Sequence, residues 1–288
     1  MPDDNFDTLL DDQQQEAPPA PEFDKGAYAA TKQQERSDLY ALADETALTV
    51  AADPAKLAQY LDVQARFDYT PTNVLLIMAQ RPDATWLGNL NYWKSQKVFI
   101  KPSEMQSAVL IIAPGDDYRR NDGSVGTNMN VRRMYDVSQA AKSRLKPEPR
   151  FDDRTFTALK NAAPLKVKGT DDLDQDAVIK DGTIFVQRGL GQEATIYALA
   201  REACRAEHLR QDGDPETADL AARSGAYVVC KKYGVDTKGI DLSDAPEYLG
   251  KMEKARDVRD ALSDVCKAAG VVTGRMTKEL EPRKPEAR

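Results

Sequence analysis

Helix and strand signals alternate along residues 69–114, and the prolines between them constrain the fold more than any other feature of the chain. Thr70-Pro71 pairs a helix N-cap residue with proline at the first helical position, where the fixed φ of proline suits the first turn. That helix is expected to end before Pro82, because the residue preceding a proline avoids helical geometry. Short apolar runs with strand composition follow. We therefore predict an α+β fold in which helices are mixed with small sheets.

The same signals predict elements along the whole chain. Expected helices cover residues 33–52, 54–67, 71–80, 89–96, 153–161, 193–210, 215–233 and about 246–269. Expected strands cover residues 98–100, 108–113, 129–137, 165–167, 177–179 and 183–186. Turn signals at 121–123 and at Asp181-Gly182 join strands, the second as a two-residue hairpin, and Gly234 is expected to end a helix.

Composition excludes several classes of protein. No apolar run approaches the ~20 residues that span a bilayer, so no membrane association is expected. The N-terminal residues lack the basic and apolar regions of a signal peptide. Three widely spaced cysteines predict reduced thiols in a cytoplasm. His208 is the single histidine, which argues against any metal site that needs two or three imidazoles.

Charge is distributed unevenly. Residues 1–30 carry eight acids and one lysine, which account for the whole net charge of −7. This acidic, proline-containing segment cannot bury enough apolar surface to offset its ordering entropy, and we predict a disordered tail. Two roles stay open for the tail, solubility or imitation of nucleic-acid charge in competition for a basic surface.

A basic segment follows further along the chain. Residues 86–145 contain nine bases against five acids, with aromatic residues between them. Basic side chains neutralise phosphates, and flat rings stack on unpaired bases. Aromatic residues beside strands are nevertheless more often part of a core. Composition alone therefore does not establish nucleic-acid binding.

The expected helix 193–210 carries an unusual set of charges. Arg201, Arg205 and His208 share one face, since they follow one another at i, i+4 and i+7. A guanidinium stays protonated and offers only donors, so neither arginine can ligate a metal. Glu207 lies near the centre of the apolar stripe, and we expect it to be the buried partner of one of these arginines.

Three runs between Tyr69 and Pro114 carry a resemblance to a known family. They read Y-T-P-T-N-V-L-L-I-M-A-Q-R-P-D-A-T-W, N-Y-W-K-S-Q-K-V-F-I-K-P and A-V-L-I-I-A-P. Together they resemble the N-terminal single-stranded-DNA-binding domain of ArdC-type antirestriction proteins, which a zinc metallopeptidase-like domain usually follows. The position of the H-E-x-x-H helix of that second domain is occupied here by residues 201–205, R-E-A-C-R.

The resemblance also bears on the metal. The third ligand of the family, a glutamate on the next helix, resembles the position of Arg223. If so, the ligand positions Arg201, Arg205 and Arg223 are all arginine, and Glu202 is the one catalytic-type residue left. We expect no metal, no cofactor and no peptidase activity, hence a pseudoenzyme. The arginines either pair with nearby acids such as Glu202 or form a cleft for a phosphate or carboxylate.

The resemblance implies two small domains, each mixing helices with a small sheet. The expected divisions are an acidic tail at 1–32, a DNA-binding domain at 33–140, a charged, proline-rich linker at 141–152, a peptidase-like domain at 153–274 and a loose tail at 275–288. The implied function is that of a cytoplasmic accessory protein of a mobile element, which binds single-stranded DNA without sequence specificity. A host or element-encoded protein is a further possible partner. The alternative is a protein-interaction module whose cleft binds a peptide, without any DNA role.

The expected DNA contacts combine the family signature Y-[ST]-x-x-N with the basic, aromatic segment. They are Tyr69, Asn73, Trp93, Lys94, Lys97, Lys101, Arg132 and Arg133. Trp93 or Tyr92 is expected to stack on bases, and the two arginines are expected to face solvent. For Asn73 a second interpretation stays open, a structural hydrogen bond that ties its helix to the following strand.

Overall fold

A computed structural model describes residues 24–120, 122–142 and 149–281. The described part of the chain divides after Glu35 into two compact units. Helix α2 spans Lys25–Ala52 and begins earlier than residue 33, because the Asp24 carboxylate caps its first turn by accepting from the backbone N–H groups of Gly26 and Ala27. Residues 1–23 of the expected acidic tail, 1–32, lie outside the described residues. Its last residues, from Lys25 on, are helical.

The first sheet has the order β1-β3-β2 and is antiparallel. Its strands are β1 (Leu87–Gly88), β2 (Val109–Arg119) and β3 (Val125–Asp136). β2 and β3 extend into the expected loop as a long ribbon, with a bulge between Pro114 and Asp117 and with Gly123 at positive φ near its tip. Residue 121 of the expected turn lies outside the described residues. The expected strand 98–100 is wrong, since only an isolated bridge forms there, between Ile100 and Ala140.

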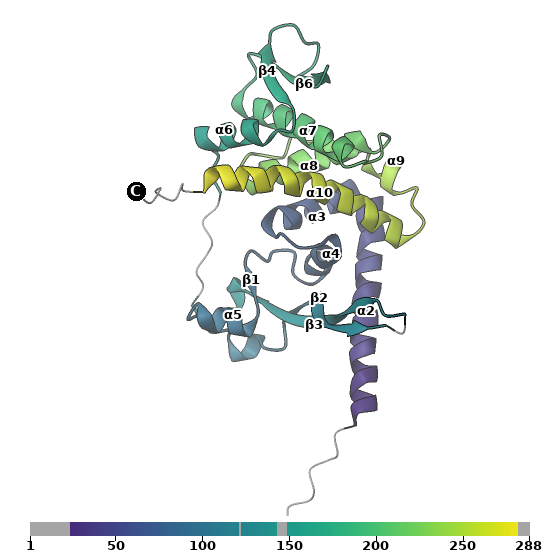
Figure 1. The fold of residues 1–288 in the computed structure, drawn as a ribbon. Coiled ribbons are helices and arrows are strands. Elements are labelled where there is room, and N and C mark those ends of the chain that lie inside the picture. The colour runs from purple at the N-terminus through teal and green to yellow at the C-terminus, as the bar shows by residue number, and fades with distance from the viewer. Residues whose placement is uncertain (1–23, 121, 143–148, 282–288) are drawn as a thin grey trace, which may run out of the picture. The chain divides into compact units, whose positions relative to one another are not determined.

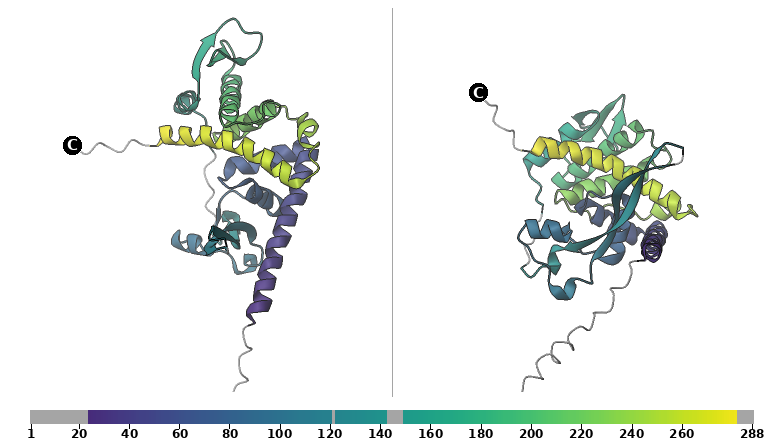
Figure 2. Two further views of the ribbon diagram at one scale, coloured as in Figure 1. Left: turned by 45° about the vertical axis from the view of Figure 1, so that its right-hand side comes forward. Right: turned by 60° about the horizontal axis from the view of Figure 1, so that its bottom comes forward.

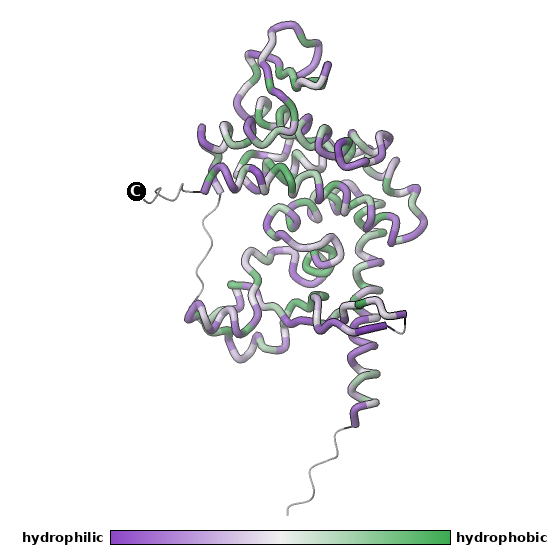
Figure 3. The backbone as a smooth tube through the Cα atoms, viewed as in Figure 1, coloured by the Kyte–Doolittle hydropathy of each residue, from purple (hydrophilic) through white to green (hydrophobic). Residues whose placement is uncertain are grey.

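Helix α4 (Pro71–Gln80) is apolar on nearly every side, and it is buried accordingly. It packs against β2 on one side and against α3 (Pro54–Arg66) on the other, as Figure 1 shows. Asp53 caps α3, accepting from Ala55 N, and proline occupies an early position in both helices, as predicted for Pro71. In Figure 3 α4 is a green segment inside the fold. Beside the sheet lie α5 (Leu90–Ser95) and the 3₁₀ turns Pro102–Glu104 and Val137–Gln139.

The second sheet has the order β4-β6-β5. β4 (Lys166–Thr170) runs parallel to β6 (Thr183–Gln187), and β5 (Ala177–Lys180) runs antiparallel to it. Asp181 and Gly182 both have positive φ, as a two-residue hairpin turn requires. Three helices accompany this sheet, namely α6 (Asp153–Ala162), α7 (Gln192–Arg210) and α8 (Ala218–Lys232). α7 packs between the sheet and α8.

The C-terminal helical region differs from expectation. The expected helix 246–269 is two helices, α9 (Ala245–Leu249) and α10 (Ala255–Leu280), separated after Gly250. α10 continues past residue 269 because its apolar stripe extends to Val272 and Met276, which are buried against α6 and α7. The expected loose tail, 275–288, is therefore helical as far as residue 280, and residues 282–288 lie outside the description. Figure 2 shows α10 in two further views.

Two large apolar clusters form the core of residues 36–288. The larger cluster joins α3, α4 and β2 to α8, α9 and α10, and the smaller one joins α6, α7, β5 and β6. Residues 143–148 of the expected linker lie outside the description. The division into domains 33–140 and 153–274 stays a prediction. Among the described helices, none combines the length and hydropathy needed to cross a bilayer.

Candidate functional site

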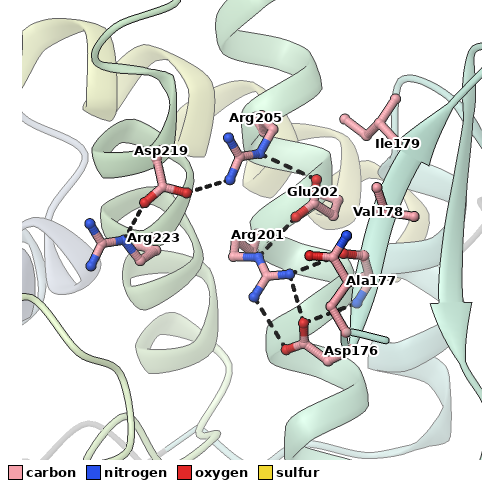
Figure 4. A pocket seen from close by; sticks show the side chains of 10 residues that line it. Asp176, Ala177, Val178, Ile179, Arg201, Glu202, Arg205, Asp219 and Arg223 are labelled. Carbon is pink, nitrogen blue, oxygen red and sulfur yellow. Dashed lines mark hydrogen bonds and ion pairs between the residues drawn. The ribbon is translucent and has the colours of Figure 1, made fainter. Parts of the chain in front are cut away.

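Three arginines converge on one cleft, shown in Figure 4. Arg201 and Arg205 lie one turn apart on α7, and Arg223 comes from the facing helix α8. Strand β5 forms the opposite wall. The cleft has a volume of about 620 Å³ and is lined by Gln175, Asp176, Ala177, Val178, Ile179, Arg201, Glu202, Arg205, Asp219 and Arg223. The structure therefore brings together the residues that the sequence singled out around R-E-A-C-R.

Arg201 is the most fully paired of the three arginines. Its Nη1 and Nη2 donate to the two carboxylate oxygens of Asp176 at 3.2 and 2.8 Å, which is a bidentate pair. Its Nε donates to Glu202 Oε1 at 2.9 Å. The second oxygen of Glu202 lies 3.3 Å from Arg205 Nε. Glu202 is only 4 % exposed, so its charge is neutralised by two guanidiniums rather than by water.

The pairing continues across to α8. Asp219 bridges Arg205 and Arg223, with 2.8 Å between Asp219 Oδ2 and Arg223 Nε. Arg223 Nη2 then donates to Asp244 Oδ2 at 2.6 Å, and its Nη1 donates to the carbonyl of Asp241 at 2.8 Å. We call this alternating series of charges the ion-pair ladder; it comprises Asp176, Arg201, Glu202, Arg205, Asp219, Arg223 and Asp244. It contains four carboxylates and three guanidiniums, so the cleft has no net positive charge.

The ladder favours the charged forms of Arg201, Asp219 and Arg223. Partial burial alone would lower the pKa of Arg201, but its hydrogen bonds to Asp176 and Glu202 outweigh burial and raise that pKa. The pKa of Arg223 is likewise raised, by Asp244 and Asp219, against the effect of burial. Burial would raise the pKa of Asp219, yet the two arginines it bridges lower it. No lone pair on a guanidinium becomes free for a metal in this setting.

The donor set does not fit a divalent metal. Zinc or manganese needs lone-pair donors, and the three inward positions on α7 and α8 carry permanent positive charge. Both oxygens of Glu202 are already paired with arginines. His208 is buried at 3 % exposure, with its Nε2 3.1 Å from the carbonyl of Asp214. Within the ranges that the structure describes, no group of three or more His, Cys, Asp or Glu side chains is arranged to hold a metal ion.

The geometry also decides between two roles for the arginines, pairing with nearby acids or binding a free phosphate or carboxylate. Every side-chain nitrogen of Arg201 and both terminal nitrogens of Arg223 donate to a carboxylate or carbonyl, and Arg223 Nε forms an ion pair with Asp219 without a hydrogen bond. A free anion would have to displace an aspartate or glutamate that the chain itself supplies. Pairing with nearby acids therefore describes these contacts better than an open anion site does.

Glu207 does not pair with a cleft arginine, and that expectation is wrong. Its side chain is fully buried and accepts from Arg210 and from Gln211 Nε2, the latter at 2.7 Å. Arg275 Nη1 lies 3.1 Å away and links α7 to α10. Burial would raise the pKa of Glu207, but hydrogen bonds from Arg210 and Gln211 lower it. The apolar stripe predicted its burial, but it did not identify a partner more than sixty residues away.

The expected DNA surface is only partly assembled. Lys94, Lys97 and Lys101 are exposed at and after α5. Arg132 and Arg133 are exposed as predicted, but they are consecutive on β3, so their side chains leave opposite faces of the ribbon. Arg133 Nη2 donates to the carbonyl of Met105 at 3.2 Å, and Arg132 Nη2 donates to that of Pro114 at 3.3 Å.

Trp93 is not available for base stacking. Its ring is 1 % exposed, and its indole N–H donates to the carbonyl of Tyr135 at 2.9 Å. Trp86 and Tyr92 pack edge-on against it, so this aromatic group is a small core. Phe99, in contrast, is 71 % exposed between Lys97 and Lys101. The period-two pattern of residues 98–100 could have identified it, since Val98 and Ile100 are half-buried.

Asn73 has a structural role in this fold. Its Nδ2 donates to the carbonyl of Ile112 at 2.7 Å, and its Oδ1 accepts from the N–H of Ile112 at 2.9 Å. Gln80 makes the same pair of bonds with Leu110 toward the other end of α4, both at 2.9 Å. β2 is an edge strand, so the two side-chain amides pair backbone groups that a fourth strand would otherwise pair. Nearby Tyr69 is half-buried.

The arrangement defines a class of fold in which a helical layer lies between two small three-stranded sheets, with a cleft between α7, α8 and β5. Two solved structures of the antirestriction protein ArdC from plasmid R388 share it. The metal-free structure is 13 % identical, with a TM-score of 0.51 over 73 % of this chain and 86 % of that one. The Mn(II)-bound structure is 14 % identical, with a TM-score of 0.52 over 72 % and 85 %.

This chain therefore has the ArdC fold, which confirms the resemblance drawn from residues 69–114. Neither a protein-family model nor a curated protein sequence matches the chain. At this level of identity the likeness concerns the fold. One of the two ArdC structures is bound to Mn(II).

Proposed function

We propose that this chain is an antirestriction-type accessory protein of a mobile element that binds single-stranded DNA without sequence specificity. We further propose that its metallopeptidase-like half is a pseudoenzyme that acts in a cytoplasm as a scaffold. The fold shared with ArdC supports the class, and three cysteines present as free thiols are consistent with that compartment.

The single observation that carries the pseudoenzyme proposal is the ion-pair ladder. A peptidase of this kind needs a metal to acidify water, and a lone carboxylate is a poor catalyst of amide hydrolysis. Glu202 is held between Arg201 and Arg205, so it is not free to act as a general base. The ladder links α7 to α8 through charge pairs, at the positions that the resemblance assigns to metal ligands.

Metal content tests this proposal directly. Protein purified without chelator is expected to contain no stoichiometric zinc or manganese by elemental analysis. Titration with either ion should produce no saturable heat, and Glu202→Gln should leave the metal content unchanged. One equivalent of bound metal that disappears on mutation of His208 or Cys204 would contradict the proposal and restore an enzymatic role.

The surface around Phe99 is the best candidate for the surface that binds single-stranded DNA. An exposed ring flanked by Lys97 and Lys101, with Lys94 nearby in the sequence, combines the stacking and the charge that unpaired DNA requires. Phe99 takes the stacking role that the sequence suggested for Trp93. Arg133 reaches the carbonyl of Met105, in the turn just after Lys101, and adds charge to the same region.

Fluorescence anisotropy with single- and double-stranded oligonucleotides at two salt concentrations tests this surface. The triple variant K94E/K97E/K101E should weaken single-strand binding at least tenfold and reduce the salt slope by about 0.7 for each phosphate that is no longer neutralised. The matched control is K166E/K168E/K180E, which reverses three exposed lysines on the second sheet. Equal affinity of the two variants for single-stranded DNA would show that the DNA binds at another surface. Phe99→Ala alone should lower affinity with little change in salt slope.

A second candidate function is peptide binding in the cleft, and the free edge of β5 favours it. The Asp176 carbonyl pairs with Gln187, toward β6, whereas the Ala177 carbonyl accepts from Arg201. By alternation, Ile179 also presents its backbone groups to the cleft, where an extended peptide could add a strand. Selection from a displayed random peptide library should enrich sequences on the wild type and not on Ile179→Pro. Enrichment together with absent DNA binding would favour this candidate.

A further inference from the structure

A second, smaller pocket lies apart from the arginine cleft and shares no lining residue with it. It has a volume of about 190 Å³ and lies where α8, α10 and the first turn of α3 meet the loop between α7 and α8. It is lined by Leu57, His208, Asp214, Thr217, Leu220, Ala221, Ser224, Leu249, Met252, Asp257, Asp260, Ala261, Leu262, Asp264 and Val265. This volume is below the ~300–1,000 Å³ of pockets for drug-sized ligands and suits one short chain of atoms.

The buried lining of the pocket is apolar apart from the His208 imidazole, which lies against the Asp214 carbonyl, and one hydroxyl. Leu57, Leu220 and Leu262 are each at most 3 % exposed. Ser224 is 1 % exposed, and among the described residues its Oγ has no hydrogen-bond partner. A buried hydroxyl without a partner is uncommon, because its desolvation is not offset. A ligand that carries hydrogen-bond donors into the pocket would supply that partner.

The rim of the pocket is acidic. Asp257, Asp260 and Asp264 follow α10 at i, i+3 and i+7, and so lie along one face of the helix. Asp257 makes no side-chain ion pair within the described part of the chain. Asp260 and Asp264 have only exposed partners on their own helix, Arg256 at 3.7 Å and Lys267 at 2.9 Å. Exposed pairs of this kind are weak and exchange readily for another cation.

The fourth carboxylate at the pocket, Asp214, is turned toward its own loop. Its Oδ1 accepts from the N–H of Glu216, and its carbonyl lies 3.1 Å from His208 Nε2. No group of His, Cys, Asp or Glu side chains in the described residues is placed to chelate a metal ion. The negative rim therefore lacks the geometry for an inorganic divalent cation and favours an organic one.

We propose that this pocket binds a primary alkylammonium group. An ammonium carries one positive charge for the aspartate rim and three donors, which can serve carboxylate oxygens and the Ser224 hydroxyl together. Its alkyl stem matches the leucine floor, in the way lysine side chains bury their methylenes along apolar surface. Such a group comes either from a free diamine or from a lysine side chain of another protein.

Ligand-observed NMR with n-butylammonium tests the proposal on the full-length protein. Saturable binding is expected, and butan-1-ol, the neutral analogue, should bind at least tenfold more weakly. The variant D257N/D260N/D264N should lose the n-butylammonium signal. The control D171N/D172N/D174N, which removes three carboxylates from the loop after β4, should keep it. Ser224→Leu, which fills the floor, should abolish binding, and circular dichroism should verify that this variant folds.

The two sources are distinguished with butane-1,4-diamine and N-acetyl-lysine methylamide. Tighter binding of the diamine assigns the pocket to a free amine, and tighter binding of the lysine derivative assigns it to a protein side chain. Equal binding of butan-1-ol and n-butylammonium would overturn the proposal. Retained binding in a folded Ser224→Leu variant, or an equal drop in the two triple-aspartate variants, would overturn it as well.

Discussion

At the scale of single residues, side-chain amides complete the edge of a sheet. Asn73 and Gln80 lie seven residues apart on α4 and reach Ile112 and Leu110, which are two residues apart on β2. Both residues of β2 point their backbone groups away from β3 because pairing alternates along an antiparallel strand. The signature that resembles a DNA-binding motif thus includes a position that holds a helix on a strand.

Asn73→Ala should lower the free energy of unfolding by about 2–4 kcal/mol, because it leaves a buried N–H and a buried carbonyl of Ile112 without partners. Chemical denaturation monitored by tryptophan fluorescence measures this change. Gln80→Ala is the matched control and should cost less, since Gln80 is half-buried and water can reach the freed groups of Leu110. A larger destabilisation by Gln80→Ala would show that burial does not set the difference.

Asp136 is a second residue with backbone partners. Its carboxylate accepts from the N–H groups of Thr85, Trp86 and Ser138. Burial alone would raise its pKa, but these donors outweigh burial and lower it. A carboxyl group whose pKa is lowered by folding stabilises the protein above the unfolded-state pKa, about 3.9 for Asp, and loses that contribution as the pH falls.

Asp136→Asn should therefore lower stability by about 1–3 kcal/mol at pH 6, and the gap to the wild type should narrow as the pH is lowered below about 4. Denaturant midpoints measured from pH 6 to pH 3 give both quantities. The comparison is made between the two proteins at each pH, since other carboxylates of the chain titrate in both. A gap that widens on acidification would contradict the assigned direction.

At the scale of elements, the ion-pair ladder connects β5, α7, α8 and α9. Three of its pairs, Asp176–Arg201, Arg205–Asp219 and Arg223–Asp244, join different elements or turns along the open cleft, and the other three lie within α7 or α8. Glu202 is the central member, because it pairs with both Arg201 and Arg205 and is 4 % exposed. Removing one partner of a buried pair leaves an uncompensated charge.

Glu202→Gln keeps the size of the side chain and removes its charge. It should lower the free energy of unfolding by about 1–3 kcal/mol. This is less than the cost of breaking a fully buried ion pair, because Arg205 remains partly solvated and Arg201 keeps its pair with Asp176. Asp171→Asn is the control, since it breaks an exposed pair with Arg188 and should change stability by less than about 0.5 kcal/mol. Denaturation at low and high salt should show that the Glu202 effect persists at high ionic strength. Equal stability of the Glu202→Gln and Asp171→Asn variants would contradict a structural role for the ladder.

At the scale of the whole molecule, helix α10 contributes to both apolar clusters of residues 36–288. The larger apolar cluster contains Leu75 and Ile77 of α4 together with Leu262 and Val265 of α10. α10 also contributes Val272 and Met276 to the second cluster. A helix that supplies both cores links the stability of the expected domains to each other.

The fragment 33–140 should accordingly lack a cooperative thermal transition when it is expressed alone, since α3 and α4 would expose the faces that α8 and α10 cover. Calorimetry and proton NMR dispersion measure this outcome. The chain lacking residues 1–23 is the control and should keep the melting temperature of the full protein within a few degrees. A fragment with native-like dispersion would instead establish 33–140 as an autonomous domain.

The sequence by itself determined the local elements and the chemistry of the cleft. Proline and N-cap positions located α3 and α4, and the Asp181-Gly182 turn located the β5–β6 hairpin, because these signals act within a few residues. The presence of arginine at positions 201 and 205 excluded metal ligation by these side chains from their chemistry alone. The fold class followed from these elements, and the resemblance to ArdC followed from the three runs between Tyr69 and Pro114.

Only the tertiary structure decided which partner each side chain meets. Glu207 pairs with Arg275, Asn73 pairs with Ile112, and Trp93 is buried while Phe99 is exposed. The partners of Glu207 and Asn73 and the burial of Trp93 depend on packing between segments far apart in the chain, whereas the exposure of Phe99 also agrees with the local alternation of residues 98–100. The unpartnered hydroxyl of Ser224 is a further example, because the pocket around it exists only where α8 packs against α10.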